Sequence, residues 1–210
     1  MKTAALVTHS HPPAAREAVE IAVAVAREAG WQLVATAEEI GKHGQAAEEV
    51  QPVDSLPHDP DLCLVFGGDG SILYALRRFA GTSVPVFGVN FGTVGFLAAV
   101  EREEAEQGIR RALAGEIETI DLPALQVEID GEQCFAFNDV SFSRRPHDRV
   151  AELTYRIADE EVGNVRCDGL VAATPAGSTG YNLANGGPIL AWGVAGFVVS
   201  FIAPDRKSVV

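Results

Sequence analysis

The stretch LCLVFGGDGSILYAL, residues 62–76, places one aspartate inside a glycine-rich turn. The apolar run before the turn is typical of a buried strand, and the pattern after it is typical of a helix. Glycines let the backbone approach a phosphate closely, and a helix N-terminus favours negative charge. Because Asp69 would repel an anion, it is better suited to accept a proton from a hydroxyl group, or to hold a metal ion that bridges to phosphates. An equally weighted alternative is that Asp69 only caps the following helix.

Two shorter segments place polar groups in apolar surroundings. GVNFGTVGF, residues 88–96, is a second glycine-rich exit from a strand, and it would adjoin the first turn if the two strands are neighbours. Standing alone, it would be interpreted as a plain strand-to-helix loop. FNDV, residues 137–140, combines an amide with a carboxylate, which suits ribose and base edges. A β-bulge or turn is an equally good interpretation of FNDV.

Residues 166–190, RCDGLVAATPAGSTGYNLANGGPIL, form the most specific stretch of the chain. It is too polar for a core and too apolar for a free linker, and a surface loop of this length without a role is uncommon. The stretch therefore predicts a binding segment. Its small donors and glycines are Asp168, Thr174, Ser178, Thr179, Tyr181, Asn182 and Asn185, with Gly177, Gly180, Gly186 and Gly187.

The rest of the composition argues against several classes of protein. The five histidines show no spacing such as HExxH, and no Ser/His/Asp order supports a hydrolase. Cys63, Cys134 and Cys167 lie far apart, which predicts free thiols in a reducing compartment. The net charge of −13 is spread, about −5 over residues 1–100 and about −8 over 101–210, which argues against a nucleic-acid partner. Since no signal peptide or membrane-spanning run is evident, we expect a cytoplasmic protein without a membrane partner.

Strands and helices alternate in the first half of the chain and must position these groups. Short continuous apolar strands of this kind indicate a parallel sheet with helices on both faces. Residues 41–60 are predicted to be a loop region. Strands are predicted at 4–8, 31–36, 62–66 and 84–90, and helices at 14–29, 71–80 and 102–114, with Gly30 and Gly81 ending two of the helices.

The pattern changes to antiparallel β after about residue 118. ALQVEIDGEQCFAF alternates around an IDGE turn, which is a hairpin signal, and AELTYRIADEEVGNV repeats the pattern. The chain therefore predicts an α/β domain followed by an antiparallel β domain.

Taken together, these motifs resemble the bacterial NAD kinases, which transfer a phosphoryl group to the 2′-hydroxyl of the adenosine ribose of NAD. GGDG alone is shared with diacylglycerol, sphingosine and phosphofructokinase-type kinases, so the long last motif makes the resemblance specific. It implies a Rossmann-like α/β domain over residues 1–117 with the GGDG turn, and an NAD-binding β-sandwich over residues 118–210. The matching segments are GGDGS (67–71), GVNFGTVGFL (88–97), FNDV (137–140), RCDG (166–169) and TPAGSTGYNLANGGPI (174–189).

The resemblance also implies roles for single residues. Asp69 would be the catalytic aspartate that faces the 2′-hydroxyl of NAD. It further implies ATP or polyphosphate as phosphoryl donor with Mg²⁺ or another divalent cation, no metal ligands from the protein, and a homodimer or homotetramer whose NAD sites are shared between subunits. The residues implied to bind phosphate or ATP are Gly67, Gly68, Gly70 and Ser71, and those implied to bind NAD are Asp69, Gly70, Phe96, Asn138, Asp139, Arg166, Asp168, Thr179, Gly180 and Tyr181.

The chain departs from the family pattern at several positions. Ser71 replaces a common Thr, Ala176 replaces a hydroxyl residue, Gly180 replaces Ala, and Ala184 replaces a frequent Ser. The largest departure follows SFIAP, where the chain runs DRKSVV while relatives continue with further strands. We therefore expect a sandwich that is incomplete at its C-terminus, with exposed edges. Two alternatives stay open: a non-catalytic dinucleotide-binding fragment, and a lipid or sugar kinase built on the GGDG turn.

Overall fold

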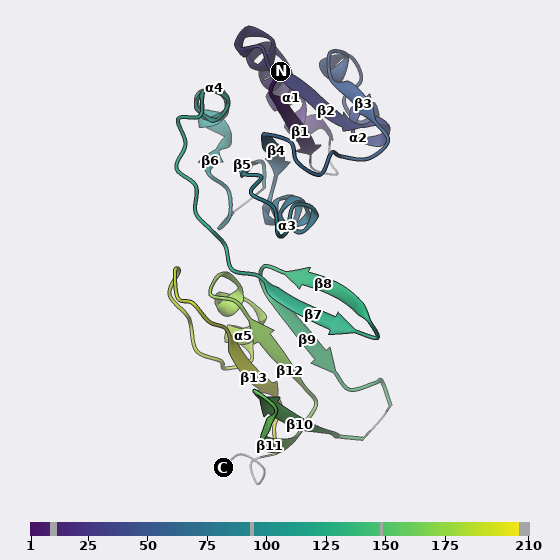
Figure 1. Ribbon diagram of the computed structural model, residues 1–210, viewed down its shortest axis with the longest axis vertical. Coiled ribbons are helices and arrows are strands. Elements are labelled where there is room, and N and C mark those ends of the chain that lie inside the picture. The colour runs from purple at the N-terminus through teal and green to yellow at the C-terminus, as the bar shows by residue number, and fades with distance from the viewer. Residues whose placement is uncertain (9–11, 93–94, 148, 206–210) are drawn as a thin grey trace. The chain divides into compact units, whose positions relative to one another are not determined.

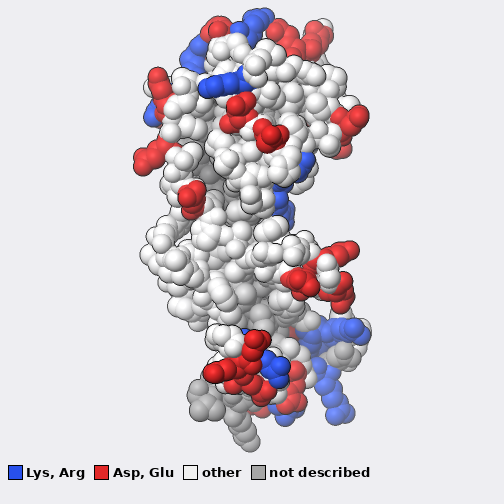
Figure 2. Space-filling model, viewed as in Figure 1, with Lys and Arg blue, Asp and Glu red and all other residues white. Residues whose placement is uncertain are grey.

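The computed structural model describes residues 1–8, 12–92, 95–147 and 149–205 (Figure 1). The chain divides into two compact units, Met1–Ile120 (unit 1) and Asp121–Val210 (unit 2). Figure 2 shows acidic side chains over both units, with basic side chains among them. Within the described ranges, no helix has the length and apolar character needed to cross a membrane.

Unit 1 is built on a six-stranded parallel sheet in the order β3-β2-β1-β4-β5-β6. The chain order reverses between β1 and β4, and the carboxyl ends of strands at such a point usually border a ligand crevice. The strands are β1 (Thr3–Thr8), β2 (Gln32–Thr36), β3 (Gln51–Val53), β4 (Leu62–Gly67), β5 (Val86–Asn90) and β6 (Val100–Glu101). The helices are α1 (Pro12–Ala29), α2 (Ala37–Gly41), α3 (Asp69–Arg78) and α4 (Ala105–Ala114), with 3₁₀ turns η1 (Gly44–Ala47) and η2 (Arg102–Glu104).

Both faces of this sheet are covered by helices, as the apolar strands predicted. Along β4, Leu62, Leu64 and Phe66 pack into a cluster with α1 and α4. The alternate residues Cys63 and Val65 pack into a second cluster with α3. Because β4 is completely buried, its carboxyl end is a fixed support for the turn that follows.

The region 41–60, predicted to be a loop, contains regular structure, so that prediction is wrong in part. After α2, which the Thr36 hydroxyl caps by accepting a hydrogen bond from the Glu39 N–H at 3.3 Å, the chain forms η1 and then β3. β3 is an edge strand of three residues that contains a proline, so it has too little alternation to be detected. Helix α3 also begins earlier than predicted, at Asp69, and its C-cap is Phe79 rather than Gly81.

Unit 2 is antiparallel throughout its described strands. Two hairpins, β7-β8 and β10-β11, accompany a three-stranded sheet in the order β13-β12-β9. Both predicted hairpins are confirmed, and each turns on two residues with positive φ, Asp130 and Gly131 in the first and Ala158 and Asp159 in the second. The elements are β7 (Leu125–Ile129), β8 (Glu132–Ala136), β9 (Asp139–Ser143), β10 (Ala151–Ile157), β11 (Glu160–Cys167), β12 (Gly169–Ala173), η3 (Ala176–Thr179), α5 (Tyr181–Ala184) and β13 (Val198–Ile202).

Candidate functional site

In unit 1, the GGDG turn lies where β4 ends and α3 begins. Gly67 is the last residue of β4, Gly68 is the N-cap of α3, and Asp69 is the first residue of the helix. The capping alternative for Asp69 is therefore wrong. Instead, its carboxylate accepts hydrogen bonds from the backbone of the second glycine loop: the Phe96 N–H lies 3.1 Å from each oxygen, and the Leu97 N–H lies 3.2 Å from Oδ1.

The two glycine-rich exits adjoin each other, as expected if their strands are neighbours. β4 and β5 pair in parallel, with Gly67 opposite Asn90. A Cβ atom on Gly92 would lie 3.5 Å from the Cα of Gly68, and a Cβ atom on Gly95 would lie 3.3 Å from Asp69 Oδ1. The Gly92 contact would be an ordinary one, whereas a Cβ atom on Gly95 would crowd the Asp69 carboxylate, so the loop passes closest to the turn at Gly95. Thr93 and Val94 of the same motif lie outside the described residues.

The first turn of α3 provides the rest of the site in unit 1. The N–H groups at the start of a helix have no partner within the helix, and they carry the positive end of its dipole. Gly70 and Ser71 follow Asp69 in this turn, with Gly70 exposed and Ser71 partly buried. Phe96, whose N–H binds Asp69, has a side chain that is 76% exposed. The turn can therefore present backbone donors to a phosphate beside one carboxylate that is held in place.

Asn90 and Glu101 belong to this site, although the sequence interpretation did not include them. Asn90 ends β5 and is buried. Its Oδ1 accepts a hydrogen bond from the Gly92 N–H at 2.9 Å, and its Nδ2 donates one to Glu101 Oε2, also at 2.9 Å. A polar residue at the end of an otherwise apolar strand, inside the quoted GVNFG segment, was the signal that could have identified Asn90.

In unit 2, FNDV and the start of the long motif lie against each other. The Asn138 carbonyl accepts a hydrogen bond from the Thr174 N–H at 2.9 Å, and Asp139 opens β9 opposite Ala173. A Cβ atom on Gly177 would lie 2.1 Å from the Asn138 oxygen, so only glycine allows this approach. Partial burial of Asp139 removes water from its carboxyl group and raises its pKa. The structure thus brings Asn138 and Asp139 beside the 174–181 segment.

Buried polar side chains hold the rest of the 174–190 segment. The Ser178 hydroxyl donates to the Pro175 carbonyl at 2.7 Å and accepts from the Leu190 N–H at 3.0 Å. The Asn182 amide donates to the carbonyls of Ser178 and Pro188, at 3.0 and 2.8 Å. Between these anchors, Thr179, Gly180 and Tyr181 are exposed and open to a ligand.

Arg166 and Asp168 are placed apart from the other predicted site residues of unit 2. Asp168 precedes β12 and forms an ion pair with Arg144 Nε at 2.8 Å, while Asp139 and Ala173 pair at the other end of β9 and β12. Four residue steps along a strand span about 13 Å. Within one chain, the RCDG motif therefore does not join the group around Asn138.

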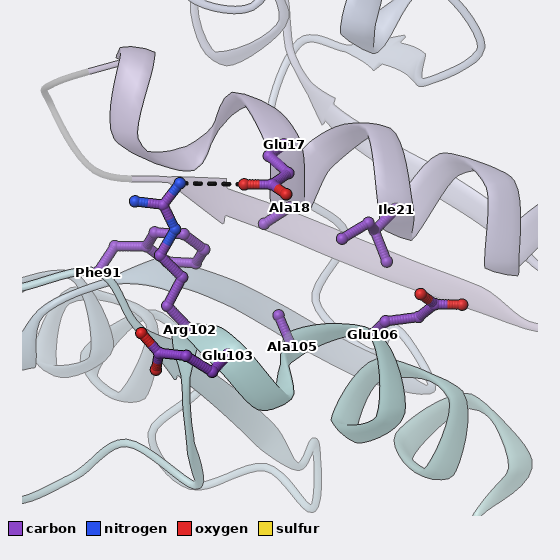
Figure 3. A pocket seen from close by; sticks show the side chains of 8 residues that line it. All are labelled: Glu17, Ala18, Ile21, Phe91, Arg102, Glu103, Ala105 and Glu106. Carbon is purple, nitrogen blue, oxygen red and sulfur yellow. Dashed lines mark hydrogen bonds and ion pairs between the residues drawn. The ribbon is translucent and has the colours of Figure 1, made fainter.

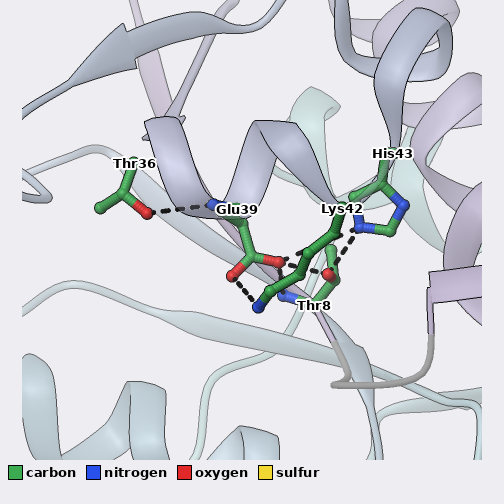
Figure 4. A network of polar contacts seen from close by, with 5 residues as sticks. All are labelled: Thr8, Thr36, Glu39, Lys42 and His43. Carbon is green, nitrogen blue, oxygen red and sulfur yellow. Dashed lines mark hydrogen bonds and ion pairs between the residues drawn. The ribbon is translucent and has the colours of Figure 1, made fainter.

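Two other polar features of unit 1 lie away from the GGDG turn, although Phe91 of the second glycine-rich segment borders one of them. Figure 3 shows a groove of about 340 Å³ between α1 and the η2–α4 segment, with Arg102 bonded to Glu17 at 3.0 Å and stacked on Phe91. Figure 4 shows a network at the end of β1, in which the Thr8 hydroxyl contacts both Glu39 and the buried His43, and Lys42 binds Glu39 at 2.9 Å. Neither includes a predicted site residue.

The cysteines and acidic residues add no metal centre to these features. All three cysteines are free thiols, and burial raises the pKa of the Cys63 thiol to about 12. Among the described residues, no group of three or more His, Cys, Asp or Glu side chains is arranged to hold a metal ion.

Comparison with known proteins gives consistent family matches. Residues 7–117 match the family model of the ATP-NAD kinase N-terminal domain, and residues 137–209 match that of the ATP-NAD kinase C-terminal domain. The chain is 41% identical to the NAD kinase of Ralstonia nicotianae over 75% of this chain and 54% of that protein. It is 35% identical to the NAD kinase of Burkholderia orbicola over 99% of this chain and 71% of that protein. The chain thus spans about half the length of the Ralstonia relative.

Solved structures show the same fold. Yeast NADH kinase complexed with NADH superposes with a TM-score of 0.79 at 21% identity, covering 99% of this chain and 67% of that chain. An NAD kinase from Archaeoglobus fulgidus in complex with ATP gives a TM-score of 0.64 at 24% identity, covering 97% of this chain and 73% of that chain. At these identities the likeness concerns the fold, an α/β unit followed by antiparallel sheets, which confirms the predicted fold class.

Proposed function

The chain belongs to the ATP-NAD kinase family, and from this premise we propose that it transfers a phosphoryl group from ATP or polyphosphate to the 2′-hydroxyl of the adenosine ribose of NAD, giving NADP. One observation carries the proposal for this chain. The Asp69 carboxylate, at the start of α3, is held by the backbone N–H groups of Phe96 and Leu97, beside a glycine turn. A fixed carboxylate at the N-terminal end of a helix, where the dipole is positive, suits a hydroxyl acceptor and a phosphate donor at once.

In this mechanism Asp69 orients the 2′-hydroxyl and accepts its proton as the oxygen attacks the terminal phosphorus of the donor. Oδ1 receives two backbone hydrogen bonds, while Oδ2 receives only the shared Phe96 N–H, so Oδ2 has more capacity left for a hydroxyl. Phosphoryl transfer passes through a loose transition state, so positioning contributes more than strong base catalysis. The turn of Gly67, Gly68 and Gly70 would bring backbone donors to the phosphates, and Ser71 would add its hydroxyl, since the Ser71 N–H already donates to the Gly68 carbonyl at 3.0 Å.

The chain's own groups make a poor metal cage, which fits a metal ion that arrives with the donor. Asp69 is the carboxylate at the turn, its oxygens already accept two N–H groups, and no cluster of three candidate ligands occurs among the described residues. Mg²⁺ is usually held by one or two carboxylates together with substrate phosphates. Mg²⁺ would neutralise charge on the phosphates when it is bound with ATP or polyphosphate.

Unit 2 supplies the groups proposed to bind NAD. Asn138 and Asp139 offer amide and carboxylate contacts to ribose and base, and Thr179, Gly180 and Tyr181 would line the pocket. Arg166 and Asp168 lie at the far end of β9 and β12 from Asn138. This separation supports a homodimer or homotetramer in which RCDG of one subunit serves the NAD site of another. We place the enzyme in the cytoplasm, where NAD and ATP are available.

The test is Asp69→Asn. The amide oxygen can still accept the Phe96 and Leu97 N–H groups, but the new NH₂ group cannot accept a proton from a hydroxyl. We expect NADP formation to fall on the order of 10²–10⁴-fold, the usual contribution of a general base, while NAD binding by calorimetry changes little. Asp59→Asn, an exposed carboxylate of the same unit, is the control and should keep full activity. Near-normal turnover of Asp69→Asn would refute the role of Asp69.

A substrate panel separates this proposal from its alternatives. NAD, diacylglycerol and sphingosine are each offered with ATP, and product is measured. NADP formation alone supports the proposal, phosphorylated lipid would indicate a lipid kinase, and calorimetric NAD binding without any product would indicate a non-catalytic dinucleotide-binding protein.

A further inference from the structure

We propose that Asn90, supported by Glu101, is a positioning residue of this site: its side-chain amide holds Gly92 and the 95–97 segment in place, and through that segment the direction of the Asp69 carboxylate. The inference rests on the proposed function for its kinetic consequence. Its structural part, the link from Asn90 to Asp69, can be tested without any activity.

Asn90 is held in place by the sheet and by burial. It is the last residue of β5, paired in register with Gly67 of β4, and its side chain is only 3% exposed. Both halves of its amide are used within the site, since Oδ1 accepts from the Gly92 N–H and Nδ2 donates to Glu101 Oε2. A buried amide with both ends bonded is held in one orientation, because turning it over would break both bonds.

The Asn90 amide is linked to three described residues that follow it in the chain. It is hydrogen-bonded to Gly92 and to Glu101, and it lies close to Gly95. Gly92 stands at the start of the glycine loop, and Glu101 lies in β6, after the loop. Between them, the chain passes directly over the amide at Gly95, where a Cβ atom would lie 3.3 Å from Asn90 Cγ. The same hypothetical atom would lie 3.3 Å from Asp69 Oδ1, so Gly95 is packed between the Asn90 amide and the catalytic carboxylate.

The consequence follows from the next two residues. Phe96 and Leu97 come directly after Gly95, and their N–H groups are the ones that Asp69 accepts, at 3.1 and 3.2 Å. If the loop changed its path over Asn90, these donors would move and the carboxylate would lose its fixed direction. Misplacement of a reacting group by about 1 Å can lower a rate on the order of 10²-fold.

The sharpest test exchanges the donor and the acceptor of the hydrogen bond between Asn90 and Glu101. Asn90→Asp keeps an oxygen for the Gly92 N–H but places a second carboxylate against Glu101, where the two charges repel. Adding Glu101→Gln restores one donor and one acceptor in reversed order, with the same net charge as the original pair. We expect Asn90→Asp to lower kcat on the order of 10- to 100-fold with little change in the KM for NAD, and the double variant to recover most of the loss.

Amide hydrogen exchange measured by NMR provides the readout that needs no turnover. The Phe96 and Leu97 amides should exchange faster in Asn90→Asp and return toward the wild-type rates in the double variant. If the wild type makes no NADP, the proposed function fails. The hydrogen-exchange experiment still tests the structural link from Asn90 to Asp69. Unchanged exchange at Phe96 and Leu97 in folded Asn90→Asp, or a double variant with no recovery of either readout, would overturn the inference.

Glu101→Ala covers the case in which Asn90→Asp does not fold. Glu101 is exposed, so its truncation leaves the core intact, but it removes the acceptor that orients the Asn90 amide. We expect faster Phe96 exchange and a several-fold lower kcat, whereas Glu104→Ala, an exposed neighbour in η2, should change neither. Identical exchange in the two variants would contradict the proposed role of the pair.

Discussion

The two units of this chain hold their functional segments in place by different means. In unit 1, the central strand β4 is buried over its whole length, and apolar clusters with α1, α4 and α3 cover both faces of the sheet. In unit 2, the buried apolar side chains among the described residues are Phe137, Val165, Cys167, Val171, Ala173 and Pro175. Three further buried side chains of unit 2, Thr174, Ser178 and Asn182, are polar, and all three lie in the 174–190 segment.

This difference determines what each segment depends on. The GGDG turn extends from a strand that hydrophobic burial already fixes, and the hydrogen bonds of Asp69 and Asn90 join the second glycine loop to this support. In the 174–190 segment, by contrast, buried polar side chains are bonded to backbone groups and support its path. Unit 2 should therefore be more sensitive to the loss of single polar contacts, and unit 1 to the loss of apolar volume.

The largest effect is expected from Gly177→Ala in unit 2. The added Cβ atom would lie 2.1 Å from the Asn138 oxygen and 2.3 Å from its carbonyl carbon, and backbone atoms cannot move aside as a side chain does. We expect the free energy of unfolding of unit 2 to fall by at least about 3 kcal/mol, measured as faster amide exchange over residues 121–205 by mass spectrometry.

Gly196→Ala is the matched control in the same unit. Its Cβ atom would meet only Val194 Cγ1 at 4.0 Å, which is an ordinary contact, so the stability should stay within about 0.5 kcal/mol of wild type. The comparison between the units fails if Gly177→Ala loosens unit 1 as much as unit 2.

The next effect isolates a single hydroxyl. Thr174 is 1% exposed, and its Oγ1 donates to the Phe137 carbonyl at 2.6 Å and accepts from the Gly177 N–H at 3.1 Å. Thr174→Val keeps the shape but leaves both backbone groups short of a partner, so we expect a loss of about 2 kcal/mol in unit 2. Urea unfolding measures this loss of stability, and Thr154→Val, a substitution at an exposed residue, is the control. Equal stability of the two variants would show that unit 2 does not depend on this contact.

Sequence reasoning succeeded where one local pattern determines the structure. The apolar strand into GGDG, the two-residue hairpin turns and the neighbouring glycine loops all follow from local periodicity and turn chemistry. Sequence reasoning failed where the hydrogen-bond partner of a side chain lies far away in the sequence. The polar spacing at Asp69 fits a helix cap, and nothing local shows that its donors come from Phe96 and Leu97. The Asn90–Glu101 bond joins two strands across a loop, which periodicity cannot reveal.

The resemblance names site residues without saying whether one chain brings them together. It implies that Arg166 and Asp168 bind NAD, and the antiparallel register places Asp168 at the opposite end of β9 and β12 from Asn138. A motif identifies which residues contact a ligand, whereas the register decides whether one chain can bring them to the same place.

The smallest predicted effect concerns pH and belongs to unit 1. His43 is fully buried, its Nε2 lies 2.7 Å from the Thr8 hydroxyl, and its Nδ1 has no hydrogen-bond partner in the part of the chain that the structure describes. Since Thr8 donates its hydroxyl proton to Glu39, a neutral ring with the proton on Nε2 satisfies the network, whereas a charged ring would bury an unpaired Nδ1–H. Burial lowers the His43 pKa from its usual 6.5; Glu39 opposes the shift, and Lys42 and Arg16 add to it.

The sign of the effect on stability follows from this shift. Because folding favours the neutral ring, the stabilisation is fully present above pH 6.5 and is lost as the pH falls through the lower pKa of the folded state. We expect the free energy of unfolding of unit 1 to decline between pH 7 and pH 5. It can be measured by urea unfolding with Trp31 fluorescence, in a Trp192→Phe background that removes the tryptophan of unit 2. His43→Gln cannot titrate, so its decline over the same range should be shallower even if it is less stable at pH 7. Equal slopes for the two proteins would mean that other groups cause the pH dependence, and that the apolar surroundings of unit 1 do not control the protonation of His43.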